Sequence, residues 1–299
     1  MPAVIDNRYL DPKILAGISS LDLVAKTVVD GFVAGLHRSP DFGFSQEFAE
    51  YRAYTPGDDL RHVDWNVFAR TERAYLKRYR GETNTEVMVL LDTSASMSFG
   101  SDGVQKFEYA KFLAASLVYL AHLQRDATGI IVFHDEVANS VAPSSRQGQL
   151  MRLLYAIDRA VLGHRTNFAA PFAQLQQLVK RRGISIVISD FYEKPESIID
   201  TLTPLRSRGQ EMILFHVLDR QEIEPKFGSS LMLVDLETDD TIEASPDYAK
   251  NEYRSKISGH IHDLQVKSEA AGIDYFLLRT DRPLDEALRE YFHIRHRRA

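Results

Sequence analysis

Five short apolar segments recur along the chain from about residue 86, and each is followed by a polar or helix-like stretch. They are EVMVLLD (86–92), GIIVF (129–133), ISIVISD (184–190), EMILFHV (211–217) and IDYFLL (273–278). Such short, nearly continuous apolar runs are typical of strands that are covered on both faces. The stretches between them, including 105–123 and 247–270, carry apolar residues at helical spacing. This alternation predicts an α/β domain built on a doubly wound, mainly parallel sheet.

One connection in this pattern is too short for a parallel crossover. Only three residues separate GIIVF from the next apolar run, VANSV (137–141), so the two should form an antiparallel hairpin at a sheet edge. With the strands numbered in chain order, the prediction is a six-stranded sheet of order 3-2-1-4-5-6 with VANSV as its one antiparallel edge strand.

The segments outside this pattern suggest the domain organisation. Residues 1–85 contain too few apolar residues for a convincing domain of their own, so they are expected to pack on a main domain spanning 86–292. The runs LMLVDLE and TIEAS predict a β-hairpin insertion within 219–246, and 293–299 form a basic tail.

Two alternating segments of the N-terminal part lack a place in the main sheet. QEFAEYRAY (46–54) and AYLKRY (74–79) flank a polar turn. Because unpaired strand edges are unfavourable in water, they are expected to pair with the 231–243 hairpin in a small accessory β region.

Composition excludes several classes of function. The 299 residues include 36 Lys and Arg against 42 Asp and Glu, a net charge of −6, which disfavours general nucleic-acid binding. The chain has no cysteine, so a disulfide scaffold, a Cys-ligated metal and a cysteine nucleophile are excluded. The start MPAVIDNRYLDPK lacks an apolar secretory core and no apolar run approaches about 18 residues, which predicts a soluble, cytoplasmic protein.

Hard oxygen donors gather at the ends of two predicted strands. Asp92, Ser94 and Ser96 follow the first strand, and Asp190 closes the strand ISIVIS. These two strands are neighbours in the predicted order, and ligands of doubly wound sheets bind at such carboxyl ends. Thr166 lies in the loop before the predicted helix that leads into the strand ISIVIS. It is therefore placed to add a third hydroxyl. The pattern predicts a Mg²⁺ or Mn²⁺ site, the alternative being a helix cap and turn.

These residues resemble a known family pattern. Asp92-x-Ser94-x-Ser96, Thr166 and Asp190 are similar to the metal-ion-dependent adhesion site of von Willebrand factor A domains. A longer upstream motif resembles the signature of the DUF58 family, whose members carry a von Willebrand A-like domain: Gly35-x-His37-Arg38-Ser39-Pro40, then Glu47-Phe48 … Arg52-x-Tyr54-x-x-Gly57-Asp58-Asp59-x-Arg61-x-x-Asp64-Trp65 … Ala69-Arg70.

The resemblance implies an interaction module and not an enzyme. In such sites the serines and the threonine bind the ion directly, the aspartates bind directly or through water, and a partner's Asp or Glu completes the shell. Members of this family are commonly encoded beside MoxR-type AAA+ ATPases. The resemblance therefore implies an adaptor for such an ATPase in the assembly or maturation of a complex.

Other interpretations stay open at the level of sequence. A metal-dependent phosphohydrolase could use Asp92 as nucleophile, although Ser94 stands where a second acid is usual and no supporting lysine is evident. The basic, Tyr-containing segment 51–80 could bind single-stranded nucleic acid. The carboxylates and arginines around Asp58, Asp59 and Asp64 are expected to lock a turn, with Trp65 as an apolar anchor.

Overall fold

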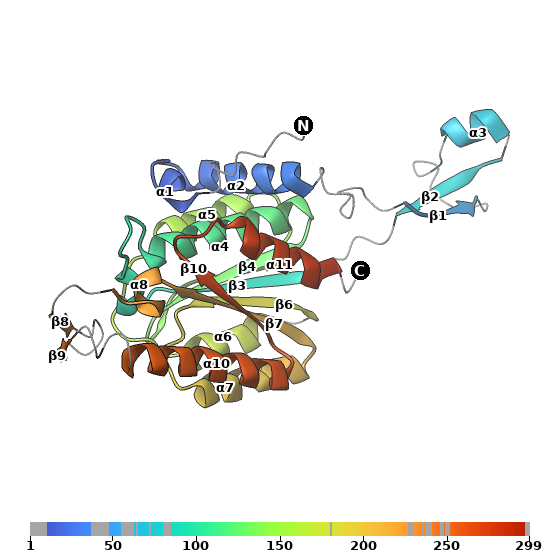
Figure 1. Ribbon diagram of the computed structural model, residues 1–299. Helices are drawn as coiled ribbons and strands as arrows, with labels where there is room; N and C mark the ends of the chain where they lie inside the picture. Colours follow the sequence, from blue (N-terminus) through green and yellow to red (C-terminus); the bar gives the residue numbers. More distant parts are fainter. Residues whose placement is uncertain are drawn as a thin grey trace.

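A six-stranded sheet forms the centre of the computed structural model (Figure 1). Its order is β10-β7-β6-β3-β4-β5, and all neighbours are parallel except β4 and β5. The strands are β3 (Glu86–Asp92), β4 (Ala127–Phe133), β5 (Val137–Ser144), β6 (Gly183–Ser189), β7 (Gln210–Leu218) and β10 (Asp274–Arg279). The predicted fold class, strand order and antiparallel edge strand are all confirmed.

Helices cover both faces of this sheet (Figure 1). One face carries α1 (Pro12–Leu15), α2 (Leu21–Leu36), α4 (Lys106–Leu123), α5 (Gln149–Asp158) and α11 (Asp285–His296); the other carries α6 (Ala169–Leu178), α7 (Pro195–Ser207) and α10 (Arg254–Ala271). The structure describes residues 11–36, 48–54, 63, 65–71, 73–79, 85–179, 181–226, 230–234, 236, 241–245, 248 and 252–296.

The central strand β3 explains the apolar runs of the sequence. Val87, Val89 and Leu91 belong to the core on the α4 side, whereas Met88 and Leu90 belong to the core on the α6 side. Because successive side chains of a strand point to opposite faces, a strand covered on both faces needs apolar residues at every position. All five of these side chains are buried.

The helix α2 forms an extra layer over α4. Val24, Val28 and Phe32 of α2 are buried in the same core as Leu113 and Leu117 of α4. The helix α4 is therefore covered by the sheet on one side and by α2 on the other. This contact ties residues 21–36 to the α/β domain.

Two further antiparallel pairs lie outside the main sheet. Strand β1 (Phe48–Ala53) pairs with β2 (Tyr75–Tyr79), and β8 (Leu231–Val234) pairs with β9 (Thr241–Ala244). Each pair is a separate two-stranded sheet. The hairpin within the insertion is confirmed, but the expected joint accessory sheet is wrong, because β1 and β2 pair only with each other and so do β8 and β9.

The polar motif between β1 and β2 is described only in part. Asp58, Asp59, Arg61 and Asp64 lie outside the described residues, whereas Val63 of the same expected turn is described. Helix α3 (Trp65–Thr71) begins with Trp65, which is 57% exposed and contacts the ring of Phe68 edge-on. The expected role of Trp65 as a buried apolar anchor is therefore wrong.

Close packing between β6 and β3 predicts a sensitive glycine. A Cβ at Gly183 would overlap the backbone carbonyl oxygen of Glu86 on β3, so Gly183→Ala must displace a central strand. We expect the free energy of unfolding to fall by about 1–3 kcal/mol, measured by urea denaturation.

The matched control for this change is Gly259→Ala. Gly259 lies in α10, is exposed, and has no atom near the position of an added Cβ. Because alanine favours helix, this variant should be more stable by about 0.5–1 kcal/mol. Equal effects of both changes would contradict the packing described for β3 and β6.

Candidate functional site

Two aspartates meet where the neighbouring strands β3 and β6 end. Asp92 is the last residue of β3, and Asp190 directly follows β6. The Ser189 hydroxyl donates to Asp92 Oδ2 at 2.5 Å, and the Ser94 amide donates to Asp92 Oδ1 at 2.8 Å. Both carboxylates are fully buried. The parallel pairing of β3 with β6 therefore brings together residues that are about a hundred positions apart in the sequence.

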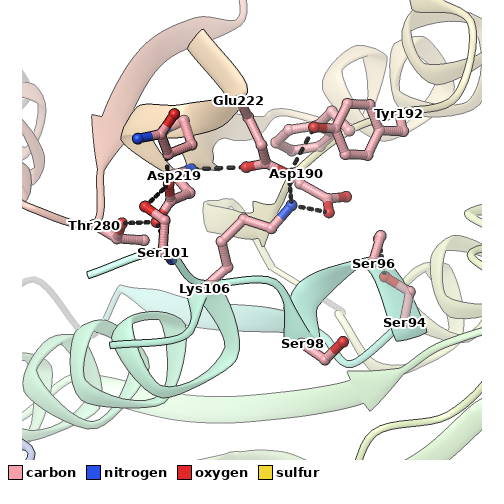
Figure 2. Close-up of polar contacts among 12 residues, drawn as sticks. Ser94, Ser96, Ser98, Ser101, Lys106, Asp190, Tyr192, Asp219, Glu222 and Thr280 are labelled. Carbon is pink, nitrogen blue, oxygen red and sulfur yellow. Dashed lines mark hydrogen bonds and ion pairs between the residues drawn. The ribbon is translucent and has the colours of Figure 1, made fainter. Parts of the chain in front are cut away.

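Two serine hydroxyls lie on the loop after β3 (Figure 2). Ser94 precedes the short helix η3 (Ala95–Ser98), and its Oγ lies 3.0 Å from Ser96 Oγ. Ser94 stands at the N-cap position, but its side chain makes no capping hydrogen bond. The helix-cap interpretation therefore leaves the Ser94 hydroxyl unexplained.

Backbone hydrogen bonds attach the loop that carries Thr166 to the segment that follows β3. The Gly163 amide donates to Thr93 O at 2.7 Å, and the Ala95 amide donates to His164 O at 2.7 Å. Thr166 is partly buried and lies two residues beyond His164. The five predicted ligands thus come from two adjacent strand ends and one loop bonded to them.

A buried lysine, which the sequence interpretation did not include, lies against Asp190 (Figure 2). The Lys106 side chain is fully buried at the start of α4. Its Nζ donates to Asp190 Oδ2 at 2.8 Å and to Glu222 Oε1 at 2.5 Å. The Tyr192 hydroxyl donates to the same Glu222 oxygen at 2.8 Å. Burial alone would lower the pKa of Lys106, but the charges of Asp190 and Glu222 raise it above its usual value, so the side chain is a cation.

The other oxygen of Asp190 is free of such contacts. Asp190 Oδ1 is buried and has no hydrogen-bond partner among the described atoms. A buried carboxylate oxygen without a partner is costly, so it points to a ligand. Oxygen donors are those that Mg²⁺ and Mn²⁺ prefer.

The backbone after Asp190 has an uncommon conformation. Phe191 has φ 48°, a left-handed value that is rare for a bulky residue. The Phe191 amide donates to Ser189 Oγ at 3.0 Å, and His260 Nε2 donates to the Phe191 carbonyl oxygen at 2.8 Å. The ring of the buried His216 contacts Phe191 edge-on. The packed turn fixes the direction in which Asp190 leaves β6.

The donors form a set of hard oxygen atoms. In the part of the chain that the structure describes, no three His, Asp or Glu side chains are arranged to hold one ion by themselves. A cation here would therefore depend on the hydroxyls of Ser94, Ser96 and Thr166 as well as on Asp92 and Asp190.

A family comparison gives the relationship of the whole chain. The model of the family described as "Protein of unknown function DUF58" matches residues 50–263. The chain belongs to the DUF58 family. This DUF58 protein has an α/β fold with a six-stranded, mostly parallel sheet, as the sequence motifs implied.

The chain is also similar to individual known proteins. An uncharacterized protein of Mycobacterium tuberculosis is 29% identical over 287 residues, which cover 94% of this DUF58 chain and 89% of the relative. An aerotolerance-related membrane protein from Bacteroides fragilis is 17% identical, with a TM-score of 0.50, and the match covers 70% of this chain and 97% of that one. The SpRpn10 VWA domain is 11% identical, with a TM-score of 0.41, and the match covers 69% of this chain and 94% of that one.

The comparisons correct the expected cytoplasmic location. A protein similar in fold is described as a membrane protein. The lack of an apolar run of about 18 residues is therefore no basis for assigning this protein to the cytoplasm. None of the described helices combines the length and the apolar content that crossing a bilayer requires.

The environment of Asp92 predicts a pH-dependent stability. Burial raises the pKa of the Asp92 carboxyl to about 7, and the nearby charge of Asp190 acts in the same direction. Because this pKa is higher in the folded than in the unfolded protein, stability in the presence of chelator should be greatest below about pH 4. It should fall as the pH rises to about 7 and then level off.

The variant Asp92→Asn should remove that part of the pH dependence. In EDTA we expect it to be more stable than the wild type at pH 8, by up to about 4 kcal/mol, with the difference shrinking towards pH 4. Urea denaturation at several pH values measures the effect, and Asp200→Asn on the exposed side of α7 is the control. A difference between wild type and Asp92→Asn that does not change with pH would contradict the described burial.

Proposed function

We propose that this protein is a non-enzymatic interaction module that binds Mg²⁺ or Mn²⁺ and uses the ion to dock a carboxylate of a partner protein. The proposed ligands are Asp92, Ser94, Ser96, Thr166 and Asp190. The observation that carries the proposal is the buried, unpartnered Oδ1 of Asp190, which lies beside a second buried carboxylate at the end of a neighbouring strand.

The chemistry of the donor set favours docking over a closed structural site. Three of the five proposed ligands are neutral hydroxyls, so an ion held there keeps positive charge for an additional anionic ligand. Magnesium retains water readily, and a partner's Asp or Glu can replace one water. The ion would supply an electrostatic contact, and this chain would supply its position.

The proposed partner is a MoxR-type AAA+ ATPase or one of its client proteins. This part of the proposal comes from the family resemblance of the sequence motifs. It places the protein as an adaptor in the assembly or maturation of a complex. No nucleic acid is included, because the net charge of the chain is −6.

One observation bears on the phosphohydrolase alternative. The lysine that seemed to be missing from the sequence is present as Lys106, but its ammonium is bonded to Asp190 and Glu222. Ser94 still occupies the position where such enzymes need a second acid. The interaction module therefore remains the better supported function.

Ser94→Ala is the direct test of the proposed ion. Its hydroxyl makes no capping bond and no core cavity is created, so the variant should fold normally and yet bind Mn²⁺ at least about tenfold more weakly. Isothermal titration calorimetry of the 299-residue chain measures this affinity.

Ser98→Ala is the matched control. Ser98 lies on the same short helix, but its hydroxyl donates to the Ala95 carbonyl oxygen at 2.7 Å and points away from Ser94 and Ser96 (Figure 2). Its Mn²⁺ affinity should equal that of the wild type. Unchanged binding in Ser94→Ala would refute the proposed ligand set, and Mg²⁺-dependent phosphate release abolished by Asp92→Asn would favour the phosphohydrolase.

A further inference from the structure

The Lys106 ammonium is a positive charge built into the candidate site. Its Nζ contacts Asp190 Oδ2 and Glu222 Oε1, and the centre of the Tyr192 ring lies 4.9 Å away. Side-chain exposure is 0% for Lys106 and 1% for Asp190, so water screens this contact poorly. The lysine thus holds one oxygen of Asp190 and leaves the other without a partner.

Glu222 is fixed as firmly as the lysine. It lies on the short helix α8 (Arg220–Ile223), where Asp219 forms a reciprocal capping box with it. The Asp219 amide donates to Glu222 Oε2 at 2.7 Å, and the Ser101 hydroxyl donates to Asp219 Oδ1 at 2.5 Å. These bonds, which Figure 2 shows, anchor the partner of the lysine on the opposite side from the serines.

The formal charges of this cluster are unbalanced without a further cation. When all three carboxyls are ionised, Asp92, Asp190 and Glu222 contribute three negative charges and Lys106 contributes one positive charge, which gives −2. A divalent cation would bring the sum to zero. Removing the lysine charge would leave the same loaded site at −1, which is unfavourable for an incoming carboxylate.

We infer that Lys106 sets the balance between the two affinities of the site, weakening the hold on the cation and strengthening the hold on a partner carboxylate. The inference rests on the proposed function and deepens it. Lys106 touches a proposed ligand without being one, so it is a positioning and charge-tuning residue. Its effect follows from the ammonium's fixed place within 2.8 Å of Asp190.

The inference predicts opposite changes in two affinities. Lys106→Gln removes the repulsion between ammonium and ion, so Mn²⁺ should bind about tenfold more tightly. The loaded site is then more negative, so acetate, used as the carboxylate probe, should bind several-fold more weakly. Glu222→Gln removes a negative charge and keeps the lysine, so it should weaken Mn²⁺ and strengthen acetate.

Titrations of the 299-residue chain measure both quantities. Calorimetry gives the Mn²⁺ affinity, and water-proton relaxation gives the acetate concentration that displaces water from bound Mn²⁺. Lys111→Gln is the matched control: Lys111 lies on the same helix, but its Nζ donates to the Asp158 carbonyl oxygen. Its two affinities should equal those of the wild type.

The outcomes separate this inference from the proposed function. If the wild type does not bind Mn²⁺, or binds it without admitting acetate, the proposed function fails and the inference falls with it. If the wild type binds both, but Lys106→Gln and Glu222→Gln weaken both affinities, the network is merely structural and only the inference is overturned. If Lys106→Gln does not fold, Glu222→Gln decides the question. Weaker Mn²⁺ binding together with tighter acetate binding supports the inference, and any other combination overturns it.

Discussion

The parallel pairing of β3 with β6 is the constraint on which the site depends. It brings Asp92 and Asp190 to the same edge of the sheet, where both are buried. Two buried carboxylates are unfavourable unless cations or donors compensate them. Lys106, the Ser189 hydroxyl and the Ser94 amide supply part of that compensation. Oδ1 of Asp190 is the carboxylate oxygen that is left without a hydrogen-bond partner among the described atoms.

The surroundings of this pair serve to keep it in place. Helix α4 presents Lys106 from its first turn and is itself held by the core that α2 covers. The left-handed Phe191 is bonded at its amide by Ser189 and at its carbonyl by His260 of α10. Elements on both faces of the sheet therefore fix Asp190, which limits how far it can move to meet a ligand.

Much of this architecture could be predicted from the sequence, since strand and helix periodicity and one three-residue connection define the strand order. Asp92, Ser94 and Asp190 could be found because they directly follow apolar runs. Lys106 and Glu222 could not, because they lie 84 and 32 residues from Asp190, and lysine at a helix start is usually exposed.

The accessory strands show a different limit. Alternation in 46–54 and 74–79 indicates a strand with two unlike faces, but backbone hydrogen bonding is the same for every partner. Pairing β1 with β2 closes a shorter loop than pairing either strand with the β8–β9 hairpin, so it costs less chain entropy. This lower cost favours the two separate pairs.

The central claim is that a divalent cation occupies the end of β3 and β6. Anomalous scattering from crystals grown with Mn²⁺ tests it most directly, because manganese is located independently of any assumed ligand. We expect one strong peak within coordination distance of the five proposed ligands, Asp92, Ser94, Ser96, Thr166 and Asp190. A map without a peak there, from crystals saturated with Mn²⁺ at neutral pH, would contradict the claim.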